Sequence, residues 1–152
     1  MVKIKTAIVN YGASQHGKTT TIRTVCEEIV KRYSCIPPSP IKYDNDNKEV
    51  YALFKIGNVT VGIESYGDPE SRQSESLKEF LSANCDIIIT ACRPRDNTRV
   101  EVENLANHGY RLIMAKDPLY ESNLQKRQSL NNCHYLANYI LDIFNDTITG
   151  RL

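Results

Sequence analysis

The fold predicted for this sequence rests on one segment, Gly12-Ala-Ser-Gln-His-Gly-Lys-Thr19. A β-rich run, Ile4–Asn10, precedes it, and from Thr19 onward apolar residues recur with the period of a helix. The two glycines allow backbone angles that turn several N–H groups inward around an anion, and the helix adds the positive end of its dipole. The stretch therefore predicts a phosphate-binding loop between a strand and a helix.

The side chains of this loop have separate predicted roles. Lys18 reaches the β- and γ-phosphates of a nucleotide as a point charge, the Thr19 hydroxyl binds Mg²⁺, and Thr20 reaches the α-phosphate. In full, the predicted nucleotide-binding residues are Gly12, Ala13, Ser14, Gln15, His16, Gly17, Lys18, Thr19 and Thr20. The alternative, a glycine-rich turn without a ligand, is disfavoured because the pattern follows a strand and opens an amphipathic helix.

Strand and helix signals alternate along the rest of the chain. Gly57-Asn58 is a hairpin signal between two β-rich runs, and Asp68 followed by Pro69 suits the start of a helix. Thr98 and Glu101 resemble a capping box. We expect strands at Ile4–Asn10, Val50–Ile56, Val59–Glu64, Asp86–Cys92 and Tyr110–Ala115, a polar loop at Tyr43–Lys48, and helices from Thr19 to Tyr33, Pro69 to Ala83, Thr98 to Gly109 and Cys133 to Phe144.

Length and alternation together predict the architecture. A chain of 152 residues fits one domain, here residues 1–152. Strands that alternate with helices indicate a mainly parallel sheet between two layers of helices. We therefore expect an α/β fold, a three-layer α/β/α sandwich whose mainly parallel sheet has about five strands, with one antiparallel edge strand from the hairpin.

Charge and composition exclude several function classes. The 19 basic and 18 acidic residues leave a net charge of +1, so the basic surplus typical of nucleic-acid-binding proteins is missing and no nucleic-acid partner is expected. The apolar run Ile87–Ile89 is too short to span a bilayer, and the first residues do not read as a signal peptide. The 5 cysteines contain no Cys-x-x-Cys pair, which argues against a metal site or a disulfide framework. We expect a cytoplasmic protein without a membrane partner.

Thr6–Arg23 resembles the first strand, loop and helix of P-loop NTPases. That superfamily binds Mg·ATP or Mg·GTP and hydrolyses the nucleotide or transfers its γ-phosphoryl group, so the resemblance implies Mg²⁺ and ATP or GTP as cofactors. Val59–Glu64 ends an apolar strand with a carboxylate, at a position that resembles Walker B in this superfamily. The resemblance implies that Thr19 and Glu64 hold the metal ion. The alternative for Glu64 is an exposed residue at a strand end.

Two further segments bear on the choice of nucleotide. Glu64-Ser-Tyr-Gly67 resembles the Asp-x-x-Gly switch of small GTPases, with glutamate in place of aspartate, and the preceding hairpin fits the same resemblance. Residues 34–49 contain no threonine, so the usual γ-phosphate-sensing residue of that family is missing there. Met114-Ala-Lys-Asp-Pro118 lacks the asparagine and the spacing of the guanine-reading Asn-Lys-x-Asp motif, which favours ATP over GTP.

An arginine-rich segment follows the strand that ends at Cys92. Ligands of open α/β sheets bind outside the carboxyl ends of the strands, and arginine can stabilise the charge of a phosphoryl-transfer transition state. Arg93 is the candidate because it lies closest to the strand. The predicted catalytic residues are then Lys18, Glu64 and Arg93. Alternatively, the arginines of this segment are solvated or pair with Asp96 and Glu101.

Three functions stay open at this point. The first is Mg²⁺-dependent hydrolysis of a nucleoside triphosphate by a small P-loop NTPase or nucleotide-dependent switch, whose turnover could need an unknown protein partner. The second is a small-molecule or nucleotide kinase, which Arg93, Arg95 and Arg99 favour but the short segment before the hairpin does not. The third is a regulatory protein that binds nucleotide with little turnover.

Overall fold

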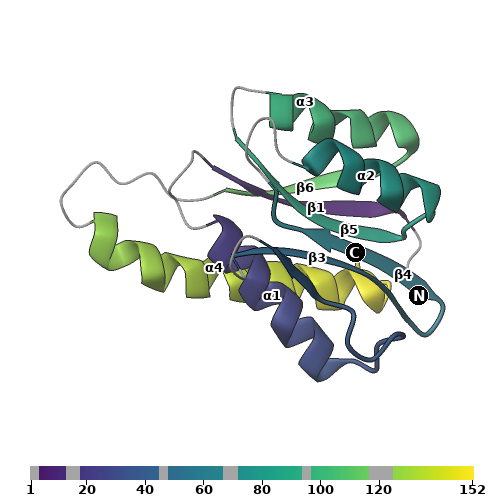
Figure 1. Cartoon of the computed structure of the whole chain (residues 1–152), viewed down its shortest axis with the longest axis horizontal. Coiled ribbons are helices and arrows are strands. Elements are labelled where there is room, and N and C mark those ends of the chain that lie inside the picture. The colour runs from purple at the N-terminus through teal and green to yellow at the C-terminus, as the bar shows by residue number, and fades with distance from the viewer. Residues whose placement is uncertain (1–3, 13–17, 45–47, 67–71, 94–96, 117–124) are drawn as a thin grey trace.

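The computed structural model describes residues 4–12, 18–44, 48–66, 72–93, 97–116 and 125–152, and of Lys18, Asn97 and residues 125–134 it describes the backbone alone. This part of the chain has an α/β fold with a 6-stranded mixed sheet, four α-helices and one 3-10 helix (Figure 1). The elements are β1 (Thr6–Tyr11), α1 (Lys18–Arg32), β2 (Lys42–Asp44), β3 (Glu49–Ile56), β4 (Val59–Glu64), α2 (Gln73–Ser82), β5 (Ile87–Cys92), α3 (Asn97–Glu103), η1 (Asn104–His108), β6 (Arg111–Lys116) and α4 (Gln125–Ile148).

The strands lie in the order β2-β3-β4-β5-β1-β6. β5 pairs parallel with both β4 and β1, and β1 pairs parallel with β6. β3 pairs antiparallel with β4 and with β2. The expected hairpin is confirmed, because Ile56 pairs with Val59 across the turn and Gly57, at φ 59°, supplies the left-handed conformation that such turns need.

The sheet differs from the predicted one at the edge beside the hairpin. The sequence predicts a mainly parallel sheet with one antiparallel edge strand, whereas the observed sheet is mixed. β3 is not at the edge, because β2 pairs along its outer side. Lys42–Asp44 overlaps the predicted loop, and its three side chains are all exposed. Such a segment has no apolar alternation of its own, so pairing with β3 makes it a strand.

The start of α2 also differs from the prediction. The helix begins at Gln73, with Arg72 in the N-cap position and no side-chain cap there. Asp68 and Pro69, the predicted cap and first residue, lie outside the described residues. α2 is instead fixed by packing: a Cβ placed on Gly62 of β4 would lie 2.6 Å from ring atoms of Phe80, so the helix approaches the strand closely only because residue 62 is glycine.

The α3–η1 segment begins one residue earlier than predicted and ends as predicted. Thr98 lies inside α3, which starts at Asn97, so it is not the helix cap. Its hydroxyl accepts a hydrogen bond from the backbone N–H of Arg93 at 2.9 Å, which fixes the turn after β5. Gly109 ends the helical segment in the left-handed conformation, with φ 88°.

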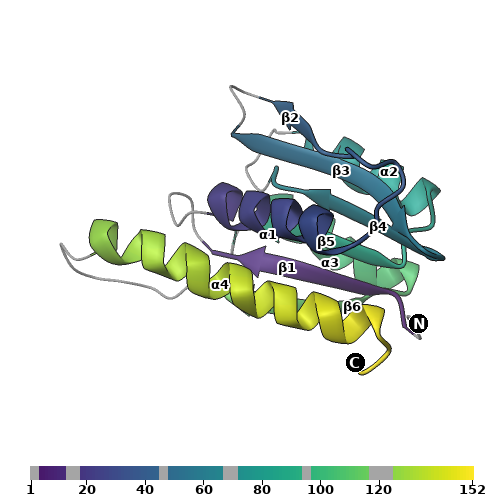
Figure 2. The ribbon, with the colours of Figure 1, turned by 90° about the horizontal axis from the view of Figure 1, so that it is seen from below.

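Helices cover both faces of the sheet. Figures 1 and 2 show α1 and α4 on one face and α2 and α3 on the other. Neighbouring residues of β1 accordingly enter two separate apolar clusters, Ile8 with the α1 and α4 side and Val9 with the α2 and α3 side. The predicted stripe of α4 is confirmed at five buried positions, Leu136, Ala137, Ile140, Leu141 and Phe144.

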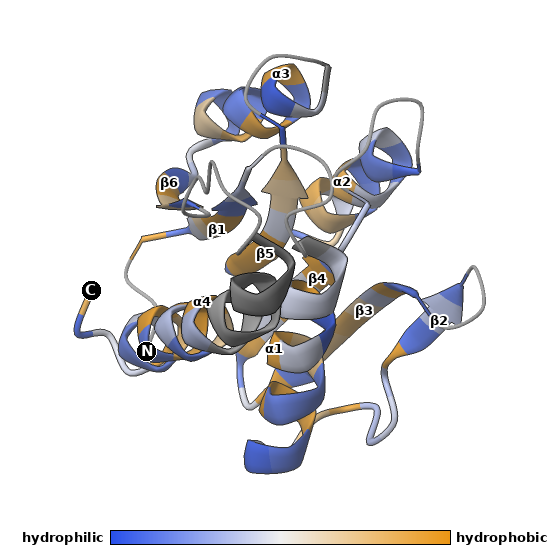
Figure 3. Ribbon diagram, turned by 90° about the vertical axis from the view of Figure 1, so that its left-hand side faces the viewer, coloured by the Kyte–Doolittle hydropathy of each residue, from blue (hydrophilic) through white to orange (hydrophobic). Residues whose placement is uncertain are grey.

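Hydrophobic residues concentrate in the centre of the sheet. Figure 3 shows β5 in hydrophobic colours, and every residue of Ile87–Cys92 is buried, as expected for a central strand with parallel neighbours on both sides. Among the helices that the structure describes, none is long and apolar enough to cross a membrane.

The connections that leave β1 and β5 go to opposite faces of the sheet. β1 is followed by α1 on one face, and the neighbouring β5 is followed by α3 on the other (Figures 1 and 2). Adjacent strands with this property define a topological switch point, where the carboxyl ends of the strands border a crevice that commonly holds the ligand. The two strands that precede the predicted phosphate-binding loop and the arginine segment in the chain, β1 and β5, therefore end at the same switch point.

Candidate phosphate-binding site

The predicted phosphate-binding loop leaves β1 at the switch point. Tyr11 ends β1, and the N–H of buried Gly12 donates a hydrogen bond to the carbonyl of Cys92, the last residue of β5, at 3.1 Å. α1 begins at Lys18, so the strand and the helix flank the loop as the pattern requires. Predicted site residues that lie outside the described part are Ala13, Ser14, Gln15, His16, Gly17 and the side chain of Lys18.

Thr19 and Thr20 lie in the first turn of α1 and are half-buried. The Thr19 hydroxyl donates a hydrogen bond to Oε1 of Glu49, the first residue of β3, at 3.3 Å. The backbone carbonyl of Thr20 accepts the Thr24 hydroxyl at 2.9 Å, inside the helix. The Thr19 side chain therefore meets a carboxylate.

Glu64 ends β4 and is fully buried, with 0% of its surface exposed, so the alternative of an exposed strand-end residue is wrong. The Thr90 hydroxyl on β5 donates to Glu64 Oε1 at 2.9 Å, and the Tyr66 N–H donates to Oε2. Gln73, the first residue of α2, donates through Nε2 to the Thr90 hydroxyl at 3.3 Å. The carboxyl group of Glu64 thus lies in a polar network between β4, β5 and α2.

This environment changes the protonation of Glu64. Burial raises the pKa of the Glu64 carboxyl to about 8, because removal from water disfavours its charge. Hydrogen bonds from Thr90 and the Tyr66 amide lower the pKa against this effect, while the charge of Glu49 raises it further. Near neutral pH, without a cation, Glu64 is therefore mostly protonated. A carboxyl group with a pKa in this range suits proton transfer at neutral pH.

Arg93 follows β5 directly and is half-buried. Its backbone N–H donates to the Thr98 hydroxyl. Arg99 is the second arginine that the structure describes in this segment. Arg99 donates from Nη1 to the Tyr11 hydroxyl at 2.9 Å and pairs with Glu103. Arg99 thus forms an ion pair with Glu103, a residue that the predicted alternative did not name. Asp96, one of the two predicted partners, lies outside the described residues.

Asn10 is a buried polar residue two positions before the loop. Its exposed fraction is 0%, and neither atom of its side-chain amide has a hydrogen-bond partner in the described part of the chain. It pairs in the sheet with Ala91 on one side and Ala115 on the other, both small and apolar. Buried amides without partners are rare because they cost free energy, so Asn10 marks an unusual polar position at the carboxyl end of β1.

The donor set near Thr19 suits a hard cation. Mg²⁺ prefers oxygen ligands, keeps several waters and commonly uses one or two carboxylates together with substrate phosphates. Thr19 and Glu49 supply such oxygen atoms, with Glu64 further along the same edge of the sheet. Within the described ranges, no group of three or more His, Cys, Asp or Glu side chains forms a complete metal site by itself.

The sequence was compared with protein-family models, with curated proteins and with solved structures, and none of the three comparisons gave a match.

Sequence reasoning missed Glu49 and Asn10. Glu49 lies in no motif and 30 residues from Thr19 along the chain, so only the path of β3 brings the two together. Asn10 did carry a signal, because it is a polar residue within an apolar strand directly before the glycine-rich stretch. Gly12, Glu64 and Arg93 are predicted site residues, and they lie at the carboxyl ends of β1, β4 and β5.

Proposed function

We propose that this chain is a small P-loop NTPase that binds a nucleoside triphosphate with Mg²⁺, ATP in preference to GTP, and hydrolyses its γ-phosphate. Its fold would be a single three-layer α/β/α domain. The observation that supports the proposal is that the glycine-rich stretch joins β1 to α1 in the chain, where β1 ends beside β5 at the switch point. A Gly-x-x-x-x-Gly-Lys-Thr pattern in this strand–loop–helix context is the arrangement that cradles polyphosphate.

The first task of the site is to bind the polyphosphate. The N–H groups of the loop and of the first turn of α1 would surround the phosphate oxygens, and Lys18 would neutralise the β- and γ-phosphates. Thr19 would hold the metal ion through its hydroxyl oxygen, and Glu64 would hold it through a bound water. When bound, Mg²⁺ supplies charge neutralisation at the phosphate oxygens.

The second task is to assist attack by water in line with the leaving group. Phosphoryl transfer depends mainly on positioning and electrostatic stabilisation. Glu64 would orient the attacking water, and its ionised form, which the charge of bound Mg²⁺ would favour, would accept a proton. Burial raises the pKa of this carboxyl to about 8, so the ionised form is a stronger base than an ordinary carboxylate. Arg93, at the end of β5, would stabilise the charge on the transferred group.

Release of inorganic phosphate from ATP tests the proposal. We expect slow, Mg²⁺-dependent release that needs no added acceptor, and ATP retained in preference to GTP when the purified protein is analysed by mass spectrometry. Glu64→Gln should keep nucleotide affinity and lose turnover. Full turnover in that variant would remove Glu64 from the mechanism. Formation of ADP that requires an acceptor, with the phosphoryl group found on the acceptor and no free phosphate, would identify a kinase. Binding without any turnover would identify a regulatory nucleotide-binding protein.

A further inference from the structure

Glu49 is the carboxylate that the described contacts bring to Thr19. The Thr19 hydroxyl donates to Glu49 Oε1 at 3.3 Å. The other oxygen, Oε2, accepts a hydrogen bond from the Ser65 hydroxyl at 2.6 Å. One carboxylate therefore joins the first turn of α1 to the residue that follows β4, and both its oxygen atoms take part.

The backbone of the sheet holds this carboxylate in place. The Ser65 hydroxyl accepts the Val50 N–H at 2.8 Å, and the Ser65 N–H donates to the Val50 carbonyl at 3.1 Å. Ser65 is buried, with 2% of its surface exposed. Glu49 thus receives its hydrogen bond from a side chain that is itself fixed by β3, which makes its orientation part of the fold.

Glu64, the acidic residue expected at the metal, has other hydrogen-bond partners than Thr19 in the described part of the chain. The preceding residue, Ile63, belongs to the apolar cluster on the α1 and α4 side. Successive side chains of a strand point to opposite faces, so Glu64 lies on the α2 side, where Thr90 and the Tyr66 N–H bind its two oxygens. The carboxylate directly beside Thr19 comes from β3 and not from β4.

We propose that Glu49 is a positioning residue for the metal site: its carboxylate accepts a hydrogen bond from the Thr19 hydroxyl and so directs the hydroxyl oxygen towards Mg²⁺. The inference rests on the proposed function and adds to it the residue that orients the metal ligand. A hydroxyl has one proton and two lone pairs, so an acceptor that fixes the proton also directs a lone pair. The charge of Glu49 beside that oxygen further favours a cation.

Titration with Mg²⁺ tests this role separately from catalysis. A fluorescent ATP analogue at fixed concentration reports nucleotide binding to the full chain as Mg²⁺ is added. Loss of a residue that orients a metal ligand commonly lowers metal affinity by about 10–100-fold. Glu49→Gln, which keeps the shape but loses the charge, should raise the half-saturating Mg²⁺ concentration by a factor in this range. Its affinity for the analogue without Mg²⁺ should stay unchanged.

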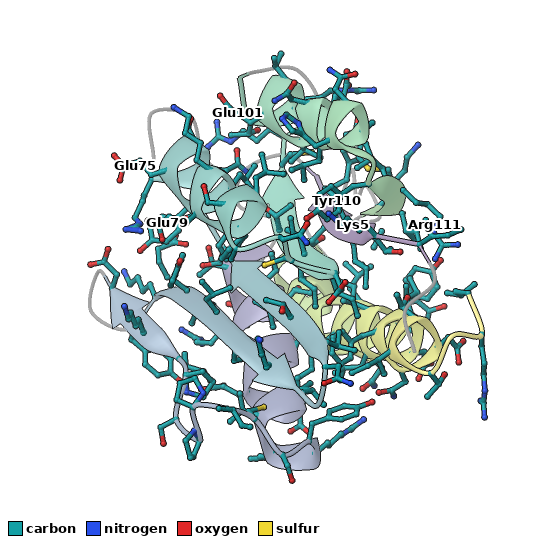
Figure 4. All side chains as sticks on the ribbon, turned by 90° about the vertical axis from the view of Figure 1, so that its right-hand side faces the viewer. Lys5, Glu75, Glu79, Glu101, Tyr110 and Arg111 are labelled. Carbon is teal, nitrogen blue, oxygen red and sulfur yellow. The ribbon has the colours of Figure 1, made fainter. Side chains whose placement is uncertain are left out.

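Three further variants separate the effect of the Glu49 charge from other effects on Mg²⁺ binding. Glu49→Asp keeps the charge on a shorter side chain, so its midpoint should lie between those of wild type and Glu49→Gln. Ser65→Ala removes the hydrogen bond to Oε2 and should give a smaller shift in the same direction. Glu75→Gln is the matched control, because it removes one negative charge at an exposed position on the outer side of α2 (Figure 4). Its half-saturating Mg²⁺ concentration should equal that of wild type.

Each outcome supports or overturns the inference. If Glu49→Gln has the same half-saturating Mg²⁺ concentration as wild type, the inference is overturned. It is also overturned if Glu49→Gln loses affinity for the analogue equally with and without Mg²⁺, because that is the sign of a structural role. If Glu49→Gln does not fold, an unshifted midpoint for Ser65→Ala overturns it. Wild type that binds no analogue at any Mg²⁺ concentration overturns the proposed function as well, whereas Mg²⁺-dependent binding with an unshifted midpoint overturns the role of Glu49 alone.

Discussion

The hydroxyl of Thr90 donates a hydrogen bond to Oε1 of Glu64 across 2.9 Å, between the neighbouring parallel strands β5 and β4. This contact partly offsets the cost of burying the carboxyl group, because hydrogen bonds to the charged form lower its pKa. The offset is incomplete, and the pKa of Glu64 stays at about 8. The stability of the protein should therefore depend on pH through this residue.

We expect the free energy of unfolding to fall as the pH rises from about 5 to about 8. Glu64 keeps its proton in the folded chain over this range, whereas in the unfolded chain it ionises near its ordinary pKa of 4.5. The folded state thus holds one proton more, and the contribution of Glu64 decreases by up to about 1.4 kcal/mol per pH unit. Below pH 4.5 and above about pH 8 its contribution is constant.

Urea unfolding without divalent cations measures this dependence. Glu64→Gln carries no ionisable group at that position, so its free energy of unfolding should fall less steeply with pH than that of wild type. In the Glu75→Gln variant, which changes an exposed residue, the free energy of unfolding should change with pH as it does in wild type. If the free energy of unfolding fell with pH equally steeply in wild type and in Glu64→Gln, the raised pKa of the Glu64 carboxyl would be contradicted.

Lys18→Ala should abolish affinity for the nucleotide and leave the fold intact. The motif assigns this side chain to the β- and γ-phosphates, and its loss removes the principal positive charge at the loop. Titration with a fluorescent ATP analogue gives the affinity, and circular dichroism checks the fold. Lys31→Ala is the matched control near the other end of α1, where the side chain is 75% exposed, and it should bind as wild type does. Unchanged binding by Lys18→Ala would refute the assignment.

Gly62→Ala should destabilise the protein by about 1–3 kcal/mol, the usual cost of an overpacked core. The added methyl group would lie 2.6 Å from ring atoms of Phe80, which is fully buried, so either the helix or the ring has to move. Chemical denaturation measures the change.

The Phe80→Leu variant supplies the control for Gly62→Ala. The smaller side chain should relieve the contact, so the double variant should be more stable than the sum of the two single changes predicts. Strict additivity of the two would show that the methyl group does not meet the Phe80 ring.

Asn10→Leu should raise the free energy of unfolding by about 1–2 kcal/mol. The amide of Asn10 is buried and lacks hydrogen-bond partners in the described part of the chain, so an apolar side chain of similar volume removes a desolvation cost. Urea denaturation tests this, with Asn10→Asp as the opposite change, which should destabilise. A loss of stability on Asn10→Leu would mean that the amide has a favourable partner.

The elements were predicted best where the local backbone conformation or burial requires a particular type of residue. Gly57-Asn58 located the hairpin, and the apolar run located β4 at Val59–Glu64 without error. Gly109 marked the end of the helical segment after α3. In each case the conformation follows from neighbours in the chain, which is the information that a single sequence carries.

Features that depend on distant segments were not predictable in the same way. β2 exists because β3 lies beside it, and its own three residues are exposed and polar. The strand order places β5 between β1 and β4, so Glu64 binds Thr90, and Glu49 is the acidic residue that reaches Thr19. The sequence identified an acidic strand end, but which carboxylate meets the hydroxyl of α1 depends on how the strands pair and on where each strand begins and ends.

The short strand β2 has a consequence for how the molecule behaves in a crowded solution. Open sheet margins offer unpaired backbone groups that can template the addition of a foreign strand and so begin aggregation. Here that margin is Lys42–Asp44, a mere three residues, with a lysine and an aspartate at its two ends. A strand that adds to β2 finds few backbone partners and must desolvate both charges, so self-assembly by pairing with β2 is discouraged.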